Sequence, residues 1–248
     1  LATQKKQSKT RKNRPVTALS LEREMKSLAD KEQAKNLARF FKTGKGDYGY
    51  GDRFLGIKVP RTRMVARTAL DLRVAEIQKL LRSPFHEIRL LALIIMVLKY
   101  PRKPEEQKAI YDLYMRDRAY INNWDLVDLS AHHIVGPYLE HRDRSILRNL
   151  AKSKVLWDRR IAILSCFYFI KNRDFALAFE LADVLISDTH DLMHKAVGWM
   201  LREIGNKDPQ AERAFLAERY KKMPRTMLRY AIEKFPEKER KGYLAGLQ

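Results

Sequence analysis

Along most of the chain, apolar residues recur every three or four positions, as they do on one face of an α-helix. Strand-like alternation is scarce. The period is clearest in one run, at Leu90, Leu91, Ile94, Ile95 and Leu98. Proline and glycine stand where helices are expected to end, at Pro60, Pro84, Pro101, Pro104, Gly205, Pro209, Pro224 and Pro236. The pattern predicts an all-α fold of about a dozen helices, most of about 10 to 18 residues.

A degenerate repeat runs through this helical pattern. A basic residue followed three positions later by a small one occurs at Arg89, Arg159 and Lys195. These positions are 70 and then 36 residues apart, two periods and one period of about 35, so a further copy is expected near Trp124. Helical repeats of this length stack as two-helix units. They predict a right-handed solenoid of HEAT-like repeats with a concave binding face, in which the small residue lets neighbouring helices approach.

Two segments depart from the helical pattern. Residues 1–15 are polar and basic and are expected to form a disordered tail, which leaves 16–248 as a single helical-repeat domain. Residues 44–56 are rich in glycine and include Tyr48 and Tyr50, with Lys58 close behind. Aromatic and basic side chains on a glycine-rich loop suit stacking and backbone contact with a nucleic acid. A flexible connector explains the same composition equally well.

The net charge of +20 narrows the class of partner. Six of the positive charges lie in residues 1–15, which contain no acid, and removing them leaves +14 on the rest of the chain. A folded body this basic most often binds nucleic acid, because neutralising phosphates releases counterions. The concave face is therefore expected to be basic. An anionic membrane surface is the weaker alternative.

Cysteine, histidine and apolar content exclude several other classes of protein. The single cysteine, Cys166, lies in an apolar run and is expected to be a buried structural thiol, because one cysteine forms neither an internal disulfide nor a cysteine metal site. His132 and His133 have no third ligand at a recognisable spacing. Neither a metal nor another cofactor is expected. No apolar run reaches the roughly 18 residues that cross a bilayer, and no secretory signal is recognised. We expect a cytoplasmic, nucleoid-associated protein, monomeric and without an obligate protein partner.

The candidate chemistry is concentrated at Trp124 and Asp128. Residues four apart lie on one face of a helix, and a helix over 123–139 would put both beside its apolar stripe. An aromatic face next to a carboxylate suits a ligand that is flat and cationic. Capping of the helix by Asn122 or Asn123, with the aspartates at its positive end, is the structural alternative; it fits Asp125 better than Asp128.

Two further segments carry candidate binding residues. Trp199 lies off the apolar stripe of its helix, on the side of Lys195 and Arg202. Packing against a neighbouring repeat would also explain that position. Arg159 and Arg160 open an apolar helix, where either could hold a phosphate or pair with Asp128.

Four motifs in the same order resemble the DNA alkylation repair family of AlkD-like DNA glycosylases. Residues 54–63 are similar to the early Phe-Leu-Gly-Ile-Lys-x-Pro segment of that family, and 124–128 to its Trp-Asp-x-Val-Asp. Residues 157–162 resemble Trp-x-Arg-Arg-x-Ala, and 195–203 resemble Lys-x-x-Gly-Trp-x-Leu-Arg-Glu. The resemblance implies a helical solenoid that hydrolyses the N-glycosidic bond of N3- or N7-alkylated purines in duplex DNA, as a monofunctional glycosylase of base excision repair.

Carried over by position, the resemblance implies that Asp128 is the catalytic carboxylate and that Trp124 and Trp199 are aromatic residues of the cleft. It also implies a DNA contact for Arg159 or Arg160, and the repeat register favours Arg159. Charge and repeats alone also allow a non-catalytic helical-repeat protein that binds nucleic acid. A protein-binding adaptor is disfavoured by the charge unless its partner is acidic.

Overall fold

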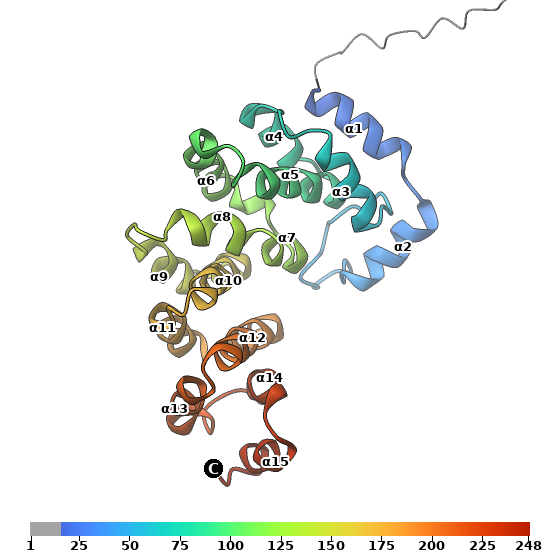
Figure 1. Cartoon of the computed structure of the whole chain (residues 1–248). Helices are drawn as coiled ribbons and strands as arrows, with labels where there is room; N and C mark the ends of the chain where they lie inside the picture. Colours follow the sequence, from blue (N-terminus) through green and yellow to red (C-terminus); the bar gives the residue numbers. More distant parts are fainter. Residues whose placement is uncertain (1–15) are drawn as a thin grey trace, which may run out of the picture.

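The computed structural model describes residues 16–248, and the predicted disordered tail lies outside them. Within this range the regular structure is helical: fifteen α-helices, three short 3-10 turns and a single β-bridge between Arg53 and Phe85. Figure 1 shows the helices stacked along a curved path, so the predicted all-α solenoid of helical repeats is confirmed. The α-helices are α1 (Ala18–Ser27), α2 (Lys31–Phe40), α3 (Val59–Arg67), α4 (Val74–Leu81), α5 (His86–Lys99), α6 (Gln107–Arg116), α7 (Trp124–Asp128), α8 (Ala131–Tyr138), α9 (Ser145–Ala151), α10 (Leu156–Lys171), α11 (Ala176–Leu185), α12 (Asp191–Lys207), α13 (Pro209–Arg219), α14 (Arg225–Ala231) and α15 (Glu237–Ala245).

From α4 onward the helices form two rows. One row is α5, α7 with α8, α10, α12 and α14, each in contact with the next, and the other contains α4, α6, α9, α11 and α13. Successive members of the first row begin at residues 86, 124, 156, 191 and 225, which are 38, 32, 35 and 34 residues apart. The period of about 35 expected from the sequence is therefore present, and its missing copy does begin at Trp124.

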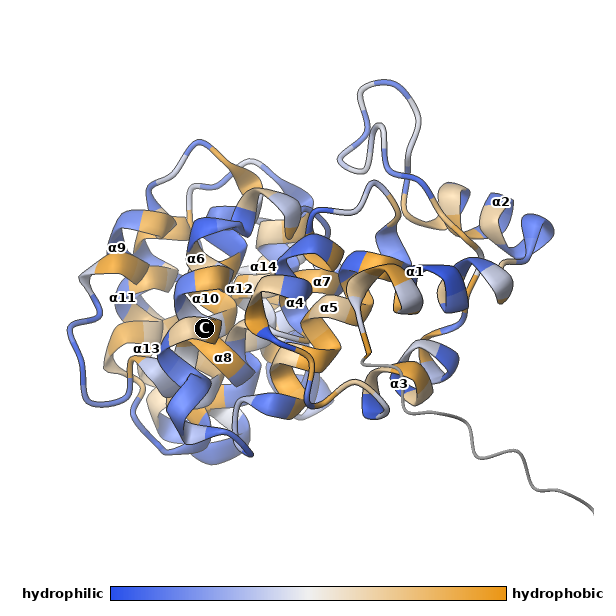
Figure 2. Cartoon of the chain, turned by 90° about the horizontal axis from the view of Figure 1, so that it is seen from above, coloured by the Kyte–Doolittle hydropathy of each residue, from blue (hydrophilic) through white to orange (hydrophobic). Residues whose placement is uncertain are grey.

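The repeats pack through small residues. A Cβ atom on Gly198 of α12 would lie 2.4 Å from the Met227 carbonyl oxygen and 2.6 Å from the Cβ of Tyr230 on α14. A Cβ on Gly136 of α8 would lie 2.5 Å from the Cβ of Tyr168 on α10. In Figure 2 the helices carry both apolar and polar residues, as expected for helices with one buried and one exposed face. α10 is buried over most of its length, as predicted, and burial raises the pKa of its Cys166 thiol.

Three details of the predicted helices are wrong. There are fifteen α-helices in residues 16–248 rather than about twelve. The helix expected over 123–139 is broken at Ser130, whose hydroxyl donates to the Leu126 carbonyl oxygen at 2.5 Å and meets the Tyr114 hydroxyl at 3.0 Å. A serine that bonds the preceding turn in this way bends or ends a helix. Gly205 lies inside α12 rather than at its end, and its missing side chain makes room for that of Glu212.

The loop between α2 and α3 is fixed by Glu87 of α5. The Glu87 carboxylate accepts the backbone N–H groups of residues 55, 56 and 57 at 2.9, 2.8 and 3.1 Å. Gly56 has φ +84°, and a Cβ there would lie 2.0 Å from the Asp30 carbonyl oxygen. The Leu-Gly-Ile motif is therefore a backbone receptor for a buried acid, and glycine is required at its centre.

None of the helices described in residues 16–248 is both long enough and apolar enough to cross a membrane.

Candidate active site

A cleft with a volume of about 400 Å³ opens along the row formed by α7, α10, α12 and α14. It contains seven of the ten residues that the sequence singled out. They come from three repeats and from the loop after α2, so only the folded chain brings them together. The lining consists of Phe40, Tyr48, Trp124, Asp128, Arg160, Leu192, Lys195, Trp199, Arg202 and Tyr230.

Asp128 is held by a bidentate ion pair with Arg160. The guanidinium donates from Nε to Asp128 Oδ1 and from Nη2 to Oδ2, both at 2.8 Å, and from Nη1 to the Leu192 carbonyl oxygen at 2.6 Å. The Arg160 side chain is 6% exposed and the Asp128 side chain 20% exposed. One arginine of α10 therefore joins α7 to α12 and fixes the plane of the carboxylate.

The carboxylate keeps some capacity for chemistry despite this pair. Each carboxylate oxygen has two lone pairs, and Arg160 uses one on each, so a second acceptor site on each oxygen remains for a water molecule or a substrate. Burial raises the pKa of Asp128 above its ordinary value, and the Arg160 guanidinium opposes that shift. The result is an anion with little hydration, supported on one side and open to the cleft on the other.

The two tryptophans border the carboxylate from different repeats. Trp124 begins α7, capped by Asn123, and its ring packs against Phe41 at 5.3 Å and Phe40 at 5.9 Å. Trp199 of α12 donates from its indole N–H to Glu203 at 2.9 Å. Both rings are partly exposed at the cleft rather than buried in the core. Asn123 caps α7, as the structural alternative proposed, and Asp128 nevertheless lines the cleft.

The basic residues at the cleft already have acidic partners. Lys195 lies 2.8 Å from Asp191, and Arg202 pairs with Glu233. The Lys195–Asp191 pair is solvent-exposed, and such pairs contribute only about 0–1 kcal/mol. A phosphate could therefore replace the acid at little cost, and the lysine would be free to contact a DNA backbone.

Three of the ten predicted site residues lie outside the cleft. Arg159 turns away from it and donates from Nε to Asp188 at 2.6 Å and from Nη1 to the Ser153 carbonyl oxygen at 2.9 Å. Tyr50 is 67% exposed and borders a separate hollow, and Lys58 is exposed at the start of α3. Between the two arginines, the one at the cleft is Arg160, whereas the repeat register had favoured Arg159 for the DNA contact. Which of them contacts DNA stays a prediction.

Three residues of the cleft were not singled out from the sequence: Phe40, Leu192 and Tyr230. A signal for Tyr230 was present, because it follows Lys195 by one period of 35 residues. Phe40 gave no such signal, since it reaches the cleft from the end of α2, outside the repeats. The rings of His132 and His133 on α8 lie with their centroids 4.0 Å apart and their planes tilted by 40°. Within residues 16–248, no group of three or more His, Cys, Asp or Glu side chains could hold a metal ion.

Comparison with known proteins bears on what this cleft does. The family of DNA alkylation repair enzymes matches residues 21–235. The chain belongs to that family. Membership assigns it to the repair of alkylated DNA, as the four motifs predicted, and all ten residues that line the cleft lie within the matched range.

One solved structure supports the fold of this DNA alkylation repair protein, and a second also matches the chain. One described as a predicted DNA alkylation repair enzyme from Enterococcus faecalis is 17% identical and superimposes with a TM-score of 0.65, covering 84% of this chain and 97% of that one. A protein from Streptococcus mutans is 19% identical with a TM-score of 0.47, covering 89% of this chain and 99% of that one. No curated protein matches the chain.

Proposed function

We propose that this repair protein is a monofunctional DNA glycosylase that hydrolyses the N-glycosidic bond of N3- or N7-alkylated purines in duplex DNA. The observation that supports it most is the partly exposed carboxylate of Asp128, fixed by Arg160 between Trp124 and Trp199. Alkylation at these ring nitrogens gives the purine a positive charge. The base then leaves with the bonding electron pair and becomes neutral, so no general acid is needed.

In this mechanism Asp128 acts on the sugar. As the glycosidic bond breaks, positive charge develops on the sugar as an oxocarbenium ion, and a fixed anion with little hydration stabilises it. The free acceptor sites of the carboxylate also orient the attacking water and take its proton, which the raised pKa of Asp128 favours. Trp124 and Trp199 hold the cationic nucleotide by cation–π contact, worth about 0.5–2 kcal/mol each.

The remaining cleft residues fit the binding of a DNA backbone. Lys195 and Arg202 line the cleft together with Tyr48 and Tyr230. Phosphates would exchange with Asp191 and Glu233 at the two basic residues. The chain acts as a monomer in this proposal and requires neither a metal nor another cofactor.

A non-catalytic role in binding damaged DNA is the second candidate. It is favoured by the bidentate pair itself, since an aspartate that only supports Arg160 would have the same geometry. Incubation of the protein with duplex DNA containing N7-methylguanine separates the two. A glycosylase releases free methylated base and leaves abasic sites, whereas a binder retains the duplex and releases nothing. Failure to release base under single-turnover conditions would reject the catalytic proposal.

A further inference from the structure

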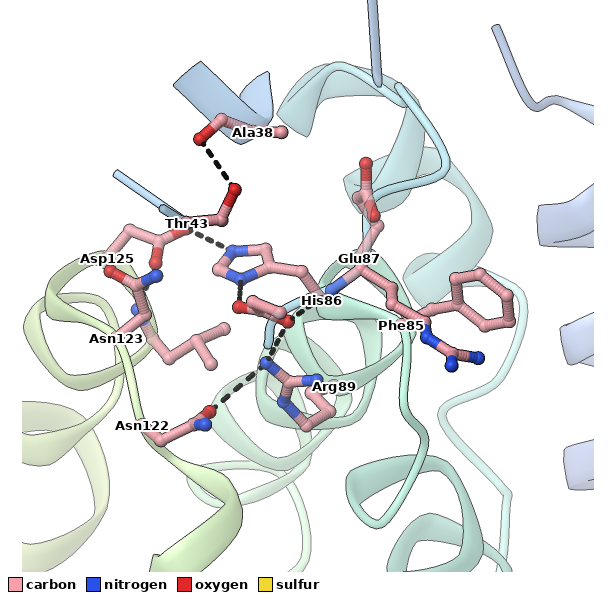
Figure 3. A network of polar contacts seen from close by, with 12 residues as sticks. Ala38, Thr43, Phe85, His86, Glu87, Arg89, Asn122, Asn123 and Asp125 are labelled. Carbon is pink, nitrogen blue, oxygen red and sulfur yellow. Dashed lines mark hydrogen bonds and ion pairs between the residues drawn. The ribbon is translucent and has the colours of Figure 1, made fainter. Parts of the chain in front are cut away.

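His86, at the start of α5, lies behind the cleft and bonds to an acid at each ring nitrogen. Its Nδ1 is 2.9 Å from Asp52 Oδ2 and its Nε2 is 2.8 Å from Asp125 Oδ2, and the side chain is 2% exposed. Figure 3 shows the ring between its partners. A histidine with a carboxylate at both nitrogens donates from both and is therefore an imidazolium.

The charges around the ring support that form. Burial by itself would lower the pKa of His86, but the hydrogen bonds to Asp125 and Asp52 outweigh it and raise the pKa to about 9. Arg89 lies behind Asp52, 2.8 Å from its other oxygen. Glu87, the next residue on α5, directs its oxygens to the backbone of residues 55–57. The charged groups that face the ring are thus two acids, one of which is shared with an arginine.

Two routes connect His86 to Trp124. The first is covalent, since Asp125 follows Trp124 in the first turn of α7. The second is a cluster of rings in which Phe41 lies 4.9 Å from His86 and 5.3 Å from Trp124. Phe54 packs against both His86 and Phe41, at 4.7 and 5.2 Å. The orientation of the indole at the cleft therefore depends on both ends of this assembly.

The same network holds the loop after α2. Asp52 lies near the end of that loop and is 3% exposed, and the His86 backbone N–H donates to the Arg53 carbonyl oxygen at 2.8 Å. Tyr48, four residues before Asp52, lines the cleft with Trp124. His86 thus joins two segments, the loop and α7, that each supply an aromatic ring to the cleft.

We propose that His86 is a positioning residue for the excision site: bonded to Asp52 and Asp125, it fixes the loop after α2 against α7 and so holds Trp124 and Tyr48 in place at the cleft. The proposal rests on the glycosylase function for its effect on activity. Its structural part stands independently and is tested without DNA.

The test follows the fluorescence of Trp124 alone. The chain has three tryptophans, and Trp157→Phe with Trp199→Phe leaves Trp124 as the only one. Acrylamide quenching and emission of Trp124 are measured from pH 7 to pH 10, with His86 present and in His86→Gln. With His86 we expect a transition near pH 9 to a more accessible indole. With glutamine, which cannot donate to both acids, we expect quenching at least twofold higher at pH 7 and no such transition.

Lys99→Met is the matched control for loss of a buried charge. Lys99 lies at the other end of α5, is 1% exposed, and donates to the Leu72 carbonyl oxygen at 2.7 Å and to Glu106 at 2.7 Å. This variant should melt at a lower temperature with unchanged quenching of Trp124. If His86→Gln behaves in the same way, the network is merely stabilising and the proposal is wrong. If His86→Gln does not fold, the absence of a transition near pH 9 in the His86 protein overturns the proposal.

Excision provides the second readout, in the otherwise unmodified chain. His86→Gln should lower the single-turnover rate of base release at least tenfold at saturating DNA, with the Kd for duplex unchanged within twofold. A normal rate together with altered quenching would reject the link to catalysis. If the unmodified protein releases no base at all, the glycosylase function fails, while the quenching result still decides the positioning of Trp124.

Discussion

Substitution of Asp128 by Asn tests the proposed catalytic group and its support together. Removing one partner of a buried ion pair costs about 3–5 kcal/mol of folding stability. Here asparagine keeps one acceptor oxygen for Arg160, and the Leu192 carbonyl oxygen remains bonded at 2.6 Å, so we expect a loss of about 2–3 kcal/mol. The transition state loses its anion, which commonly costs about 3 kcal/mol or more. Base release should therefore fall at least about a hundredfold.

The two losses are measured separately. Urea unfolding gives the free energy of unfolding, and single-turnover release of N7-methylguanine, at a temperature where the variant is fully folded, gives the rate. The double variant Asp128→Asn/Arg160→Met removes the unpaired guanidinium. It should recover much of the stability and none of the activity. Excision at the rate of the unmodified protein by folded Asp128→Asn would refute the catalytic assignment.

Three further predictions follow from the cleft, the charge and the buried histidine. Trp199→Ala should remove a large part of the excision rate but cost about 1 kcal/mol of folding stability or less, whereas loss of a fully buried tryptophan costs about 3–5 kcal/mol. A low melting temperature with normal excision would identify a packing residue instead. The chain without residues 1–15 retains a charge of +14 and should bind duplex DNA with a log–log salt slope of about −0.9 per phosphate contact; loss of binding at low salt would place the affinity in the removed segment. Folding raises the pKa of His86 from 6.5 to about 9. The charged imidazolium therefore stabilises the folded protein fully below pH 6.5, and about 3 kcal/mol of folding stability is lost as the pH rises through 9. Urea unfolding at pH 6 and pH 10 should show this loss, and His86→Gln should lack it.

The sequence predicted those parts of the cleft that depend on helical period. Trp124 and Asp128 share a face because they are four residues apart, and both line the cleft. Trp199 was recognised because it lies off the apolar stripe of its helix, and it is partly exposed there. These features are local, and a helical wheel contains the information that decides them.

Features that depend on contacts between distant segments were missed. Arg159 pairs with Asp188, 29 residues after it, and Arg160 with Asp128, 32 residues before it, and the repeat register did not separate these two roles. The break at Ser130 depends in part on the Tyr114 hydroxyl. The environment of His86 comes from acids 34 residues before it and 39 residues after it. No period in the sequence marks such partners, so a single sequence gives no means of pairing them.

The missing side chain at Gly198 has a consequence for substrate size. Tyr230 lines the cleft, and α14 places its Cβ 2.6 Å from where a Cβ on Gly198 would lie. A methyl group at that position would act as a spacer between two repeats and move α14 outward as a unit, because packed helices shift rather than compress. The width of the cleft at Tyr230 therefore depends on the residue at position 198, which does not itself line the cleft. If the protein is the proposed glycosylase, a substitution at Gly198 would change which adducts fit the cleft while every residue of its lining stays the same.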